Sequence, residues 1–319
     1  MTKVLLEKDL LEAATLLRQG EVVAFPTETV YGLGAAIFNE KAVAKIFSLK
    51  KRPSDNPLIA HISSFDQLSS IAREIPFAFY LLAEAFFPGP LTIILKKHPQ
   101  VPSIVSAGQD TIALRMPSHP LAIALISLVG QPLVAPSANL SGKPSATSVA
   151  HVLEDFGGSL EALLDGGETS LGIESTVLSL CDKERPLLLR PGSITKEQIE
   201  AVLGYPVEVF SKHVKAHEKV ISPGMKYRHY APKAPIVIIH SESELKEHFI
   251  KSPLKKSLLL SSQKQHSLCE WAELTSPSFY ARLRYADKGG FEEILILLDP
   301  ETLSNAALMN RLLRAAGLA

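Results

Sequence analysis

Hydroxyl and acidic side chains follow an apolar stretch near the start of this chain. Residues 21–24 are typical of a short buried strand, and residues 25–34 read FPTETVYGLG. A hydroxyl, a carboxylate and a second hydroxyl therefore stand together where a core strand ends, and α/β proteins often place ligand groups there. Gly32 and Gly34 predict a tight turn and a close approach of the backbone to a neighbour.

Cationic side chains recur at the ends or on the faces of predicted elements, and the four of interest are Lys50, Arg52, Arg115 and Arg190. Lys50 and Arg52 close the helix predicted over residues 39–49, where cations either complement the helix dipole or clamp a phosphate. Arg115 lies on one face of a predicted strand. An arginine inside an α/β core is rare without an anionic partner, so a carboxylate or phosphate ligand is predicted there.

Other polar positions have ordinary structural interpretations. His61 lies in the strand predicted over residues 58–62, and a histidine there is more often a core residue than a catalytic one. Ser137 and Asn139 follow the strand predicted over residues 133–135, where serine and asparagine also form common turns.

Two glycine-containing segments match nucleotide-binding motifs only in part. Residues 141–145, SGKPS, lack the leading glycine and the hydroxyl residue of a P-loop, so that interpretation is rejected. Residues 32–37 lack the third glycine of a dinucleotide fingerprint, so that interpretation carries little weight.

Residues 223–232, PGMKYRHYAP, combine two tyrosines with three cations between prolines. Such side chains can stack on a base and contact phosphates. A solvated basic linker is the alternative, but a plain flexible linker has little need for this composition. The segment is therefore interpreted as a lid over a nucleotide.

The elements that must position these residues mix strands and helices without strict alternation. This favours an α/β or α+β domain with a large mixed sheet over residues 1–207. Residues 208–233 are interpreted as the linker or lid. Residues 234–319 are interpreted as a small α/β domain, plausibly with a parallel sheet. Its strands are predicted over residues 236–240, 256–260 and 293–299.

The apolar periodicity of the first domain predicts further elements. Helices are predicted over residues 65–73, 77–87, 121–129, 148–156 and 195–203. Strands are predicted over residues 91–96, 111–115, 161–164, 176–180 and 187–190.

Bulk composition excludes several classes of protein. The chain has 319 residues, 46% of them apolar, with 33 basic and 33 acidic residues and zero formal net charge. Whole-molecule attraction to nucleic acid is therefore not expected. Cys181 and Cys269 are far apart, which argues against a disulfide scaffold and a zinc site. No signal-like or membrane-spanning apolar segment is evident, since the longest apolar stretch covers only residues 121–129, so a cytoplasmic protein is predicted.

Taken together, these motifs resemble the YrdC-type threonylcarbamoyl-AMP synthase family in its long form, which has a second C-terminal domain. The resemblance lies in PTETVYGLG, K-x-R-P with NPL, RMP, PSAN and EST, and it resumes in the segment PGMKYRHYAP. It implies a YrdC-like twisted mixed sheet around a positively charged cleft, with a small Rossmann-like C-terminal domain. The implied reaction converts L-threonine, bicarbonate and ATP into threonylcarbamoyl-adenylate and pyrophosphate, for a tRNA modification next to the anticodon.

The family pattern also implies site residues at the matching positions of this chain. The L-threonine site would use Thr29, His61, Arg115 and Ser175. The ATP site would use Lys50, Arg52, Asn56, Thr111, Ser137, Asn139, Ser145, Arg190 and Tyr230. Lys50 and Arg52 are the implied catalytic cations. Arg115 would hold the amino-acid carboxylate, and His61 would contact the side-chain hydroxyl or nearby polar groups, which displaces the core-residue interpretation of His61.

The implied reaction needs no side-chain nucleophile, so positioning and charge stabilisation would carry it. Mg²⁺ is expected with ATP, although no acidic cluster marks a metal site in the protein itself. The product would pass to a threonylcarbamoyl-transferase complex acting on tRNA. An RNA-binding module without adenylate chemistry is the main alternative, and neutral net charge counts against it. A carbamoyl-transfer domain like those of hydrogenase-maturation proteins is a third, which the cysteine spacing does not support.

Overall fold

The computed structural model describes residues 1–182, 185–210, 229–252, 254–263 and 269–318, and they form two compact units. The first unit comprises residues 1–141 and 146–227. The second comprises residues 142–145 and 228–319. Residues 211–228, which hold most of the predicted lid, lie outside the described residues.

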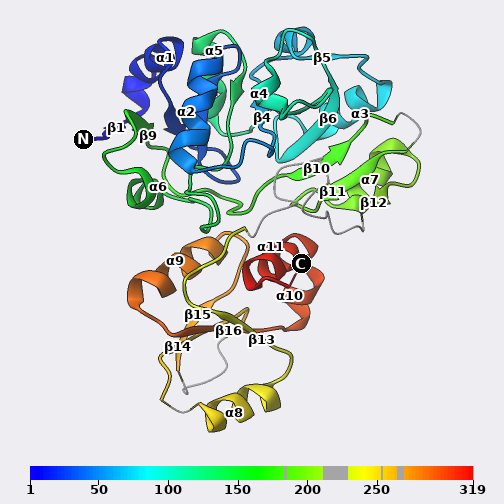
Figure 1. The fold of residues 1–319 in the computed structure, drawn as a ribbon. Coiled ribbons are helices and arrows are strands. Elements are labelled where there is room, and N and C mark those ends of the chain that lie inside the picture. The colour runs from blue at the N-terminus through cyan, green and yellow to red at the C-terminus, as the bar shows by residue number, and fades with distance from the viewer. Residues whose placement is uncertain (183–184, 211–228, 253, 264–268, 319) are drawn as a thin grey trace. The chain divides into compact units, whose positions relative to one another are not determined.

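The first unit contains a large mixed sheet (Figure 1). Its spatial order is β1-β9-β2-β3-β8-β4-β7-β6-β10-β11-β12, with β5 paired to β6. The strands are β1 (Lys3–Leu5), β2 (Val23–Phe25), β3 (Gly32–Ala36), β4 (Ile59–His61), β5 (Ala72–Arg73), β6 (Leu91–Lys97), β7 (Thr111–Arg115), β8 (Leu133–Val134), β9 (Ala162–Leu164), β10 (Thr176–Ser179), β11 (Leu187–Arg190) and β12 (Glu208–Val209). Parallel and antiparallel pairs alternate irregularly, as the mixed sequence pattern predicts, so the expected fold class is confirmed.

The helices of the first unit cover the sheet from two sides. They are α1 (Leu10–Arg18), α2 (Glu40–Lys50), α3 (Phe77–Phe86), α4 (Ser103–Ser106), α5 (Pro120–Val129), α6 (Val149–Phe156) and α7 (Lys196–Leu203), with 3₁₀ turns at Glu7–Asp9 and Phe65–Ser70. Apolar side chains of α1 and α5 pack on β2, β8 and β9, while those of α2, α3, α6 and α7 pack on the opposite face. Side chains alternate between the two faces along β2. Val23 and Phe25 pack with α1 and α5, whereas Ala24 packs on the face covered by α2, α3, α6 and α7.

Two predictions about local structure are wrong, and one strand was not predicted. The helix predicted over residues 65–73 is a 3₁₀ turn followed by the short strand β5. The tight turn predicted at Gly32 and Gly34 is also wrong, because both glycines lie in β3 and pair with β2. They serve close packing instead: a Cβ atom on Gly34 would lie 2.7 Å from Cε1 of Phe25. Strand β15 was not predicted at all.

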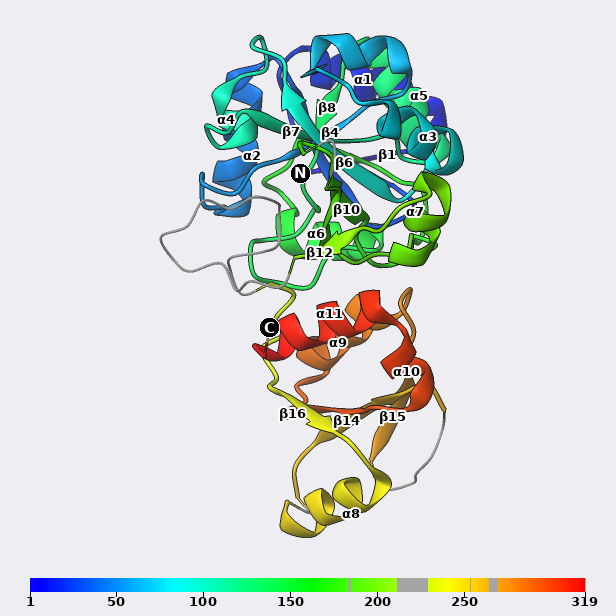
Figure 2. The same cartoon turned by 90° about the vertical axis from the view of Figure 1, so that its right-hand side faces the viewer.

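The second unit is a parallel four-stranded sheet within the described residues, in the order β13-β16-β14-β15. Its strands are β13 (Ile236–Ile239), β14 (Ser257–Ser261), β15 (Glu270–Glu273) and β16 (Glu293–Leu297). Its helices are α8 (Glu242–Lys251), α9 (Phe279–Gly289), α10 (Pro300–Ser304) and α11 (Ala306–Ala316). Figures 1 and 2 show α8 on one face of this sheet and α9 with α11 on the other, which is the arrangement of a small Rossmann-like domain.

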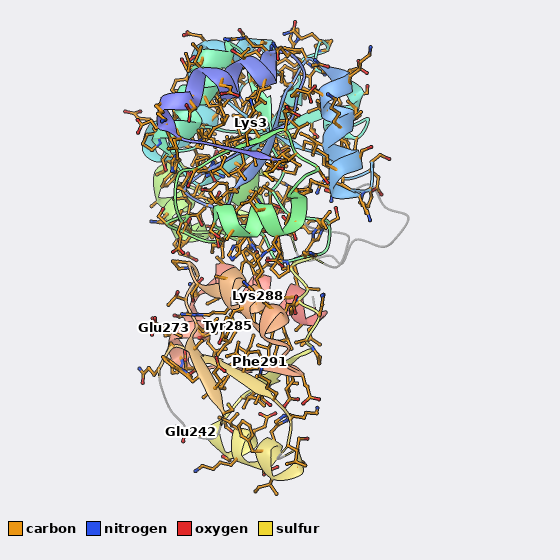
Figure 3. All side chains as sticks on the ribbon, turned by 90° about the vertical axis from the view of Figure 1, so that its left-hand side faces the viewer. Lys3, Glu242, Glu273, Tyr285, Lys288 and Phe291 are labelled. Atoms are coloured by element: carbon orange, nitrogen blue, oxygen red, sulfur yellow. The ribbon has the colours of Figure 1, made fainter. Side chains whose placement is uncertain are left out.

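Aromatic packing closes one end of α9. The ring of Tyr285 lies 5.8 Å from that of Phe291, and Lys256 Nζ lies 4.7 Å from the centre of the Phe291 ring. Figure 3 labels Tyr285 and Lys288 of α9 and also Phe291, which follows the end of this helix. No helix among the described residues is long and apolar enough to cross a membrane.

Candidate active site

The site lies on a half of the sheet that carries polar side chains around a small apolar floor. This half is formed by β4, β7, β6, β10 and β11 (Figure 2). The floor consists of Ile59, Ile94, Ala113, Val177 and Leu189. Alternation places the predicted residues His61 and Arg115 on the same face as this floor, next to one another on adjacent strands.

Arg115 ends β7, and its guanidinium is held by three different groups. Nε donates to the carbonyl oxygen of Gly89 at 3.1 Å, and Nη1 donates to Thr29 Oγ1 at 2.8 Å. Nη2 forms an ion pair with Glu28 Oε1 at 2.6 Å, and the Arg115 side chain is only 4% exposed. A guanidinium has more N–H groups than these contacts use, so both terminal nitrogens retain donors for a bound carboxylate.

The loop between β2 and β3 supplies the groups that face Arg115. Thr27 Oγ1 and Thr29 Oγ1 are 2.8 Å apart, and Thr27 Oγ1 also donates to the carbonyl oxygen of Val30. Burial raises the pKa of Glu28, but the Arg115 guanidinium and the backbone N–H groups of Glu28 and Ser118 together outweigh burial, and the net pKa lies below its ordinary value. Glu28 is therefore a buried anion at neutral pH.

His61 is a neutral hydrogen-bonding group. Burial, with the Arg115 charge in second place, lowers the pKa of His61 to about 3. Its Nδ1 lies 3.2 Å from the carbonyl oxygen of Ile59, and because a carbonyl only accepts, Nδ1 carries the proton. Nε2 is then an acceptor, suited to a ligand hydroxyl. The ring of Phe25 packs edge-on against His61, with ring centres 6.2 Å apart.

A β-bulge aims Arg190 at this face. In the antiparallel pair of β10 and β11, Val177 stands opposite Arg190 and Leu178 opposite Leu188, so Leu189 is the extra residue. Residues that stand opposite one another point to the same face, which puts Arg190 beside Val177 on the apolar floor. Strict alternation after Leu189 would have turned Arg190 to the other face.

Arg190 and β6 together fix the serine that precedes β10. Arg190 Nε donates to the carbonyl oxygen of Ser175 at 3.1 Å, and Nη2 donates to Ser175 Oγ at 3.2 Å. Thr92 Oγ1 lies 2.7 Å from the same hydroxyl. Gly192 follows at a point with no room for a side chain, because its Cβ would lie 2.2 Å from the backbone nitrogen of Thr176.

A second group of predicted residues gathers at the end of α2. Lys50 is buried, and its Nζ donates to the carbonyl oxygens of Ser137 and Asn139. Ser137 Oγ donates to Asn139 Oδ1. The turn after β8 is thus attached to the last residue of α2, which brings an ammonium, a hydroxyl and an amide together as phosphate ligands require.

Arg52 and Asn56, which follow Lys50 in the sequence, form a smaller hydrogen-bonded group. Arg52 Nε donates to the carbonyl oxygen of Asn56 at 3.3 Å, and its Nη2 donates to that of Pro57 at 3.0 Å. Asn56 is 2% exposed, and its Oδ1 meets no donor within the described residues. A buried amide oxygen without a donor is unusual and points toward a group that is added on binding.

One predicted residue of the first unit, Thr111, is not brought next to these groups. Thr111 begins β7 on the face of Arg115 but lies four positions away, about 13 Å along the strand. Its hydroxyl donates to Gln109. Ser145 and Tyr230 belong to the second unit, where both are buried and Tyr230 stacks between His229 and Tyr280. Their assignment to ATP stays a prediction.

Three groups to which the sequence gave no role lie in contact with predicted residues. Glu28 pairs with Arg115, the Gly89 carbonyl accepts from Arg115, and Thr92 contacts Ser175. Thr92 gave a usable signal, because it is a hydroxyl in the otherwise apolar run of β6. Among the described residues, no group of three or more His, Cys, Asp or Glu side chains could bind a metal ion.

These features define an α/β protein whose first unit gathers a buried guanidinium, a neutral imidazole and a fixed serine hydroxyl on one face of its sheet, groups that could hold a small carboxylate, and places cations that could hold phosphates at the end of α2 and on β11. Two family models match the chain. The Sua5/YciO/YrdC model, described as telomere recombination, matches residues 15–192, and a model described as threonylcarbamoyl-AMP synthase, C-terminal domain, matches residues 194–317. The chain belongs to the Sua5/YciO/YrdC family of threonylcarbamoyl-AMP synthases, in its two-domain form.

Full-length relatives agree with this assignment. Threonylcarbamoyl-AMP synthase of Bacillus subtilis is 47% identical over 321 residues, covering 96% of this chain and 92% of that protein. The enzyme of the same name from Pyrococcus abyssi is 44% identical, covering 96% and 93%. The crystal structure of P. abyssi Sua5 complexed with L-threonine matches with a TM-score of 0.90 and 42% identity, covering 100% of this chain and 98% of that one.

Proposed function

We propose that this chain catalyses formation of threonylcarbamoyl-AMP from L-threonine, bicarbonate and ATP, with release of pyrophosphate. The observation that carries the proposal is the buried Arg115 guanidinium, held by Thr29 and Glu28 with donors to spare for one carboxylate. The full-length relatives named for this activity supply the reaction class, and the threonine complex of P. abyssi Sua5 supplies the amino acid.

The residues around Arg115 suit L-threonine. Arg115 would bind the α-carboxylate through its terminal nitrogens. His61 Nε2, an acceptor in this tautomer, would receive the hydrogen bond of the threonine hydroxyl. Ser175, fixed by Thr92 and Arg190, would provide a further polar contact. Because His61 is neutral above about pH 3, it leaves the charge of the pocket unchanged at neutral pH.

The cations at the end of α2 and on β11 suit the triphosphate. Lys50, Arg52 and Arg190 would stabilise the negative charge that develops as pyrophosphate leaves. Ser137 and Asn139 would add hydrogen bonds near the reacting phosphate. Mg²⁺ would be bound chiefly by phosphate oxygens and water, since this cation prefers such ligands and the described residues offer no acidic cluster.

The reaction then proceeds in two bond-forming steps. The neutral amine of threonine attacks carbon dioxide, supplied by bicarbonate, and loses a proton to form a carbamate. A carbamate oxygen attacks the α-phosphorus of ATP, and the bond to pyrophosphate breaks. Neither step needs a nucleophile from the protein, so the protein's contribution is to align the reactants and stabilise charge. The product would pass to the transferase that modifies tRNA.

The proposal can be tested by measuring pyrophosphate release with L-threonine or bicarbonate left out of the reaction. Release from ATP should require both L-threonine and bicarbonate, and should fall to the rate of the ATP-only control when either is left out. Equal release without threonine would contradict the proposed function. Salt-dependent RNA binding without any adenylate formation would favour the RNA-binding alternative instead.

A further inference from the structure

Glu28 is the one acidic side chain that the described contacts place against Arg115, and the proposed reaction does not use it. Oε1 lies 2.6 Å from Arg115 Nη2, and the carboxylate is 8% exposed. Neither Oε1 nor Oε2 meets a donor at hydrogen-bonding geometry among the described residues, so the contact with Arg115 is an ion pair. The N–H groups of Glu28 and Ser118 nevertheless lie near the carboxylate and help to lower its pKa.

A buried guanidinium without a counter-ion is strongly destabilising, and Glu28 supplies that counter-ion while also changing the net charge that a ligand meets. Arg115 alone would present a positive pocket that attracts any small carboxylate. With Glu28 at 2.6 Å, the pair has no net charge, and His61 beside it is neutral. A neutral pair of opposite charges complements a ligand that carries one charge of each sign, because each ligand charge then meets an opposite one and the ligand brings no net charge.

We propose that Glu28 is a positioning and specificity residue, which orients Arg115 and makes the pocket select zwitterionic amino acids over carboxylic acids that lack the amine. This inference rests on the proposed threonine pocket and adds a determinant of substrate class to it. Arg190 reaches the pocket through Ser175, and the ATP phosphates are the anion proposed for that guanidinium.

The test compares two ligands on three proteins by calorimetric titration. The ligands are L-threonine and 3-hydroxybutyrate, which has the same carboxylate and hydroxyl without the amine. The proteins are the wild type, Glu28→Gln and Glu293→Gln. Glu293→Gln is the matched control, because it removes another buried, ion-paired carboxylate that lies in the second unit.

The wild type and Glu293→Gln should both prefer threonine strongly. In Glu28→Gln, the preference for threonine over 3-hydroxybutyrate should fall by about tenfold, the scale of one charge-assisted contact, with tighter binding of the monocarboxylate. If both ligands weaken by the same factor, Glu28 only holds Arg115 in place and the proposed selectivity is wrong. An unchanged ratio at unchanged affinities also overturns it.

A ligand comparison on the wild type keeps the inference testable if Glu28→Gln does not fold. A neutral pocket should bind threoninamide, a cation, and 3-hydroxybutyrate, an anion, more weakly than threonine. Binding of 3-hydroxybutyrate as tight as that of threonine would overturn the inference. The proposed function fails on another readout, namely pyrophosphate release without threonine, which leaves the binding selectivity measurable.

Discussion

Two buried glutamates, one in each unit, have very different surroundings. Glu28 in the first unit forms an ion pair with Arg115, but neither of its oxygens meets a donor at hydrogen-bonding geometry among the described residues. Glu293 in the second unit uses both oxygens. Oε1 accepts from Ser257 at 2.7 Å and lies 2.8 Å from His248, and Oε2 lies 3.0 Å from Lys255.

The difference separates a site from a structural cluster. A buried polar group that is fully paired stabilises the fold, whereas one left partly unpaired lowers stability and persists where function requires it. The Glu293 cluster joins α8 to the first residues of the two central strands, β14 and β16. The Glu28 pair instead leaves donors of Arg115 available for a ligand.

Replacing Arg115 should give the largest effect on binding. Arg115→Ala removes charge-assisted hydrogen bonds to the substrate carboxylate, which contribute about 1.5–3 kcal/mol each, so threonine affinity should fall about 10- to 100-fold or more. ATP affinity should change far less. Titration of each ligand measures both, and equal losses for threonine and ATP would show that the role of Arg115 is misassigned.

Removing the charge of Glu293 should cost stability without touching the pocket. Burial raises the pKa of Glu293, but its hydrogen bonds from His248, Ser257 and Lys255 outweigh burial, and the net pKa is lowered. Glu293→Gln should lower the free energy of unfolding by about 2 kcal/mol near neutral pH. The loss should shrink as the pH falls below the ordinary glutamate pKa. Denaturant titration measures this free energy of unfolding. A change of threonine affinity in Glu293→Gln would show that Glu293 is not a purely structural carboxylate and would remove the contrast with Glu28.

His61 should make the pocket sensitive to acid. Its pKa falls from an ordinary 6.5 to about 3 in the folded chain, so between these values the unfolded chain binds the extra proton. Stability is therefore lost as the pH falls below 6.5, by up to about 1.4 kcal/mol per pH unit for this proton. His61→Asn should flatten the pH dependence of unfolding between pH 6.5 and 5. If the free energy of unfolding depends on pH equally in the variant and the wild type, the acid sensitivity does not come from His61.

Tyr230 tests whether the second unit contributes more than structure. Tyr230→Ala should weaken ATP retention by a few-fold, the scale of one stacking or aromatic contact, and should leave threonine affinity unchanged. Tyr280→Ala is a suitable control, because Tyr280 stacks on Tyr230 within the same unit and was not assigned to ATP. Unchanged ATP affinity in Tyr230→Ala would return residues 223–232 to the interpretation as a plain linker.

Local patterns predicted much of the fold. Apolar runs predicted β6 and β7. A burial argument predicted a carboxylate or phosphate ligand for Arg115, and the structure places an anionic partner from the chain itself, Glu28, against it. The identity of that partner was not predictable, because Glu28 lies in a distant loop and only the folded sheet brings it close. The prediction had assigned the anion to a ligand, and the structure adds a carboxylate of the chain itself.

Other failures have equally local causes. The bulge at Leu189, which turns Arg190 into the site, leaves no mark in the sequence LLLR. Strand β15 reads EWAE, with exposed glutamates at both ends, because it lies at the edge of its sheet. Edge strands need only one apolar residue against the core, and that is too weak a pattern to predict.

Direct detection of the product tests the central claim. The protein would be incubated with ATP, L-threonine and carbon-13-labelled bicarbonate, and the reaction quenched for mass spectrometry. Labelled threonylcarbamoyl-AMP should form with the wild type. It should be absent when threonine is omitted and strongly reduced in Arg115→Ala. Formation of pyrophosphate without labelled threonylcarbamoyl-AMP would contradict the proposed synthase activity.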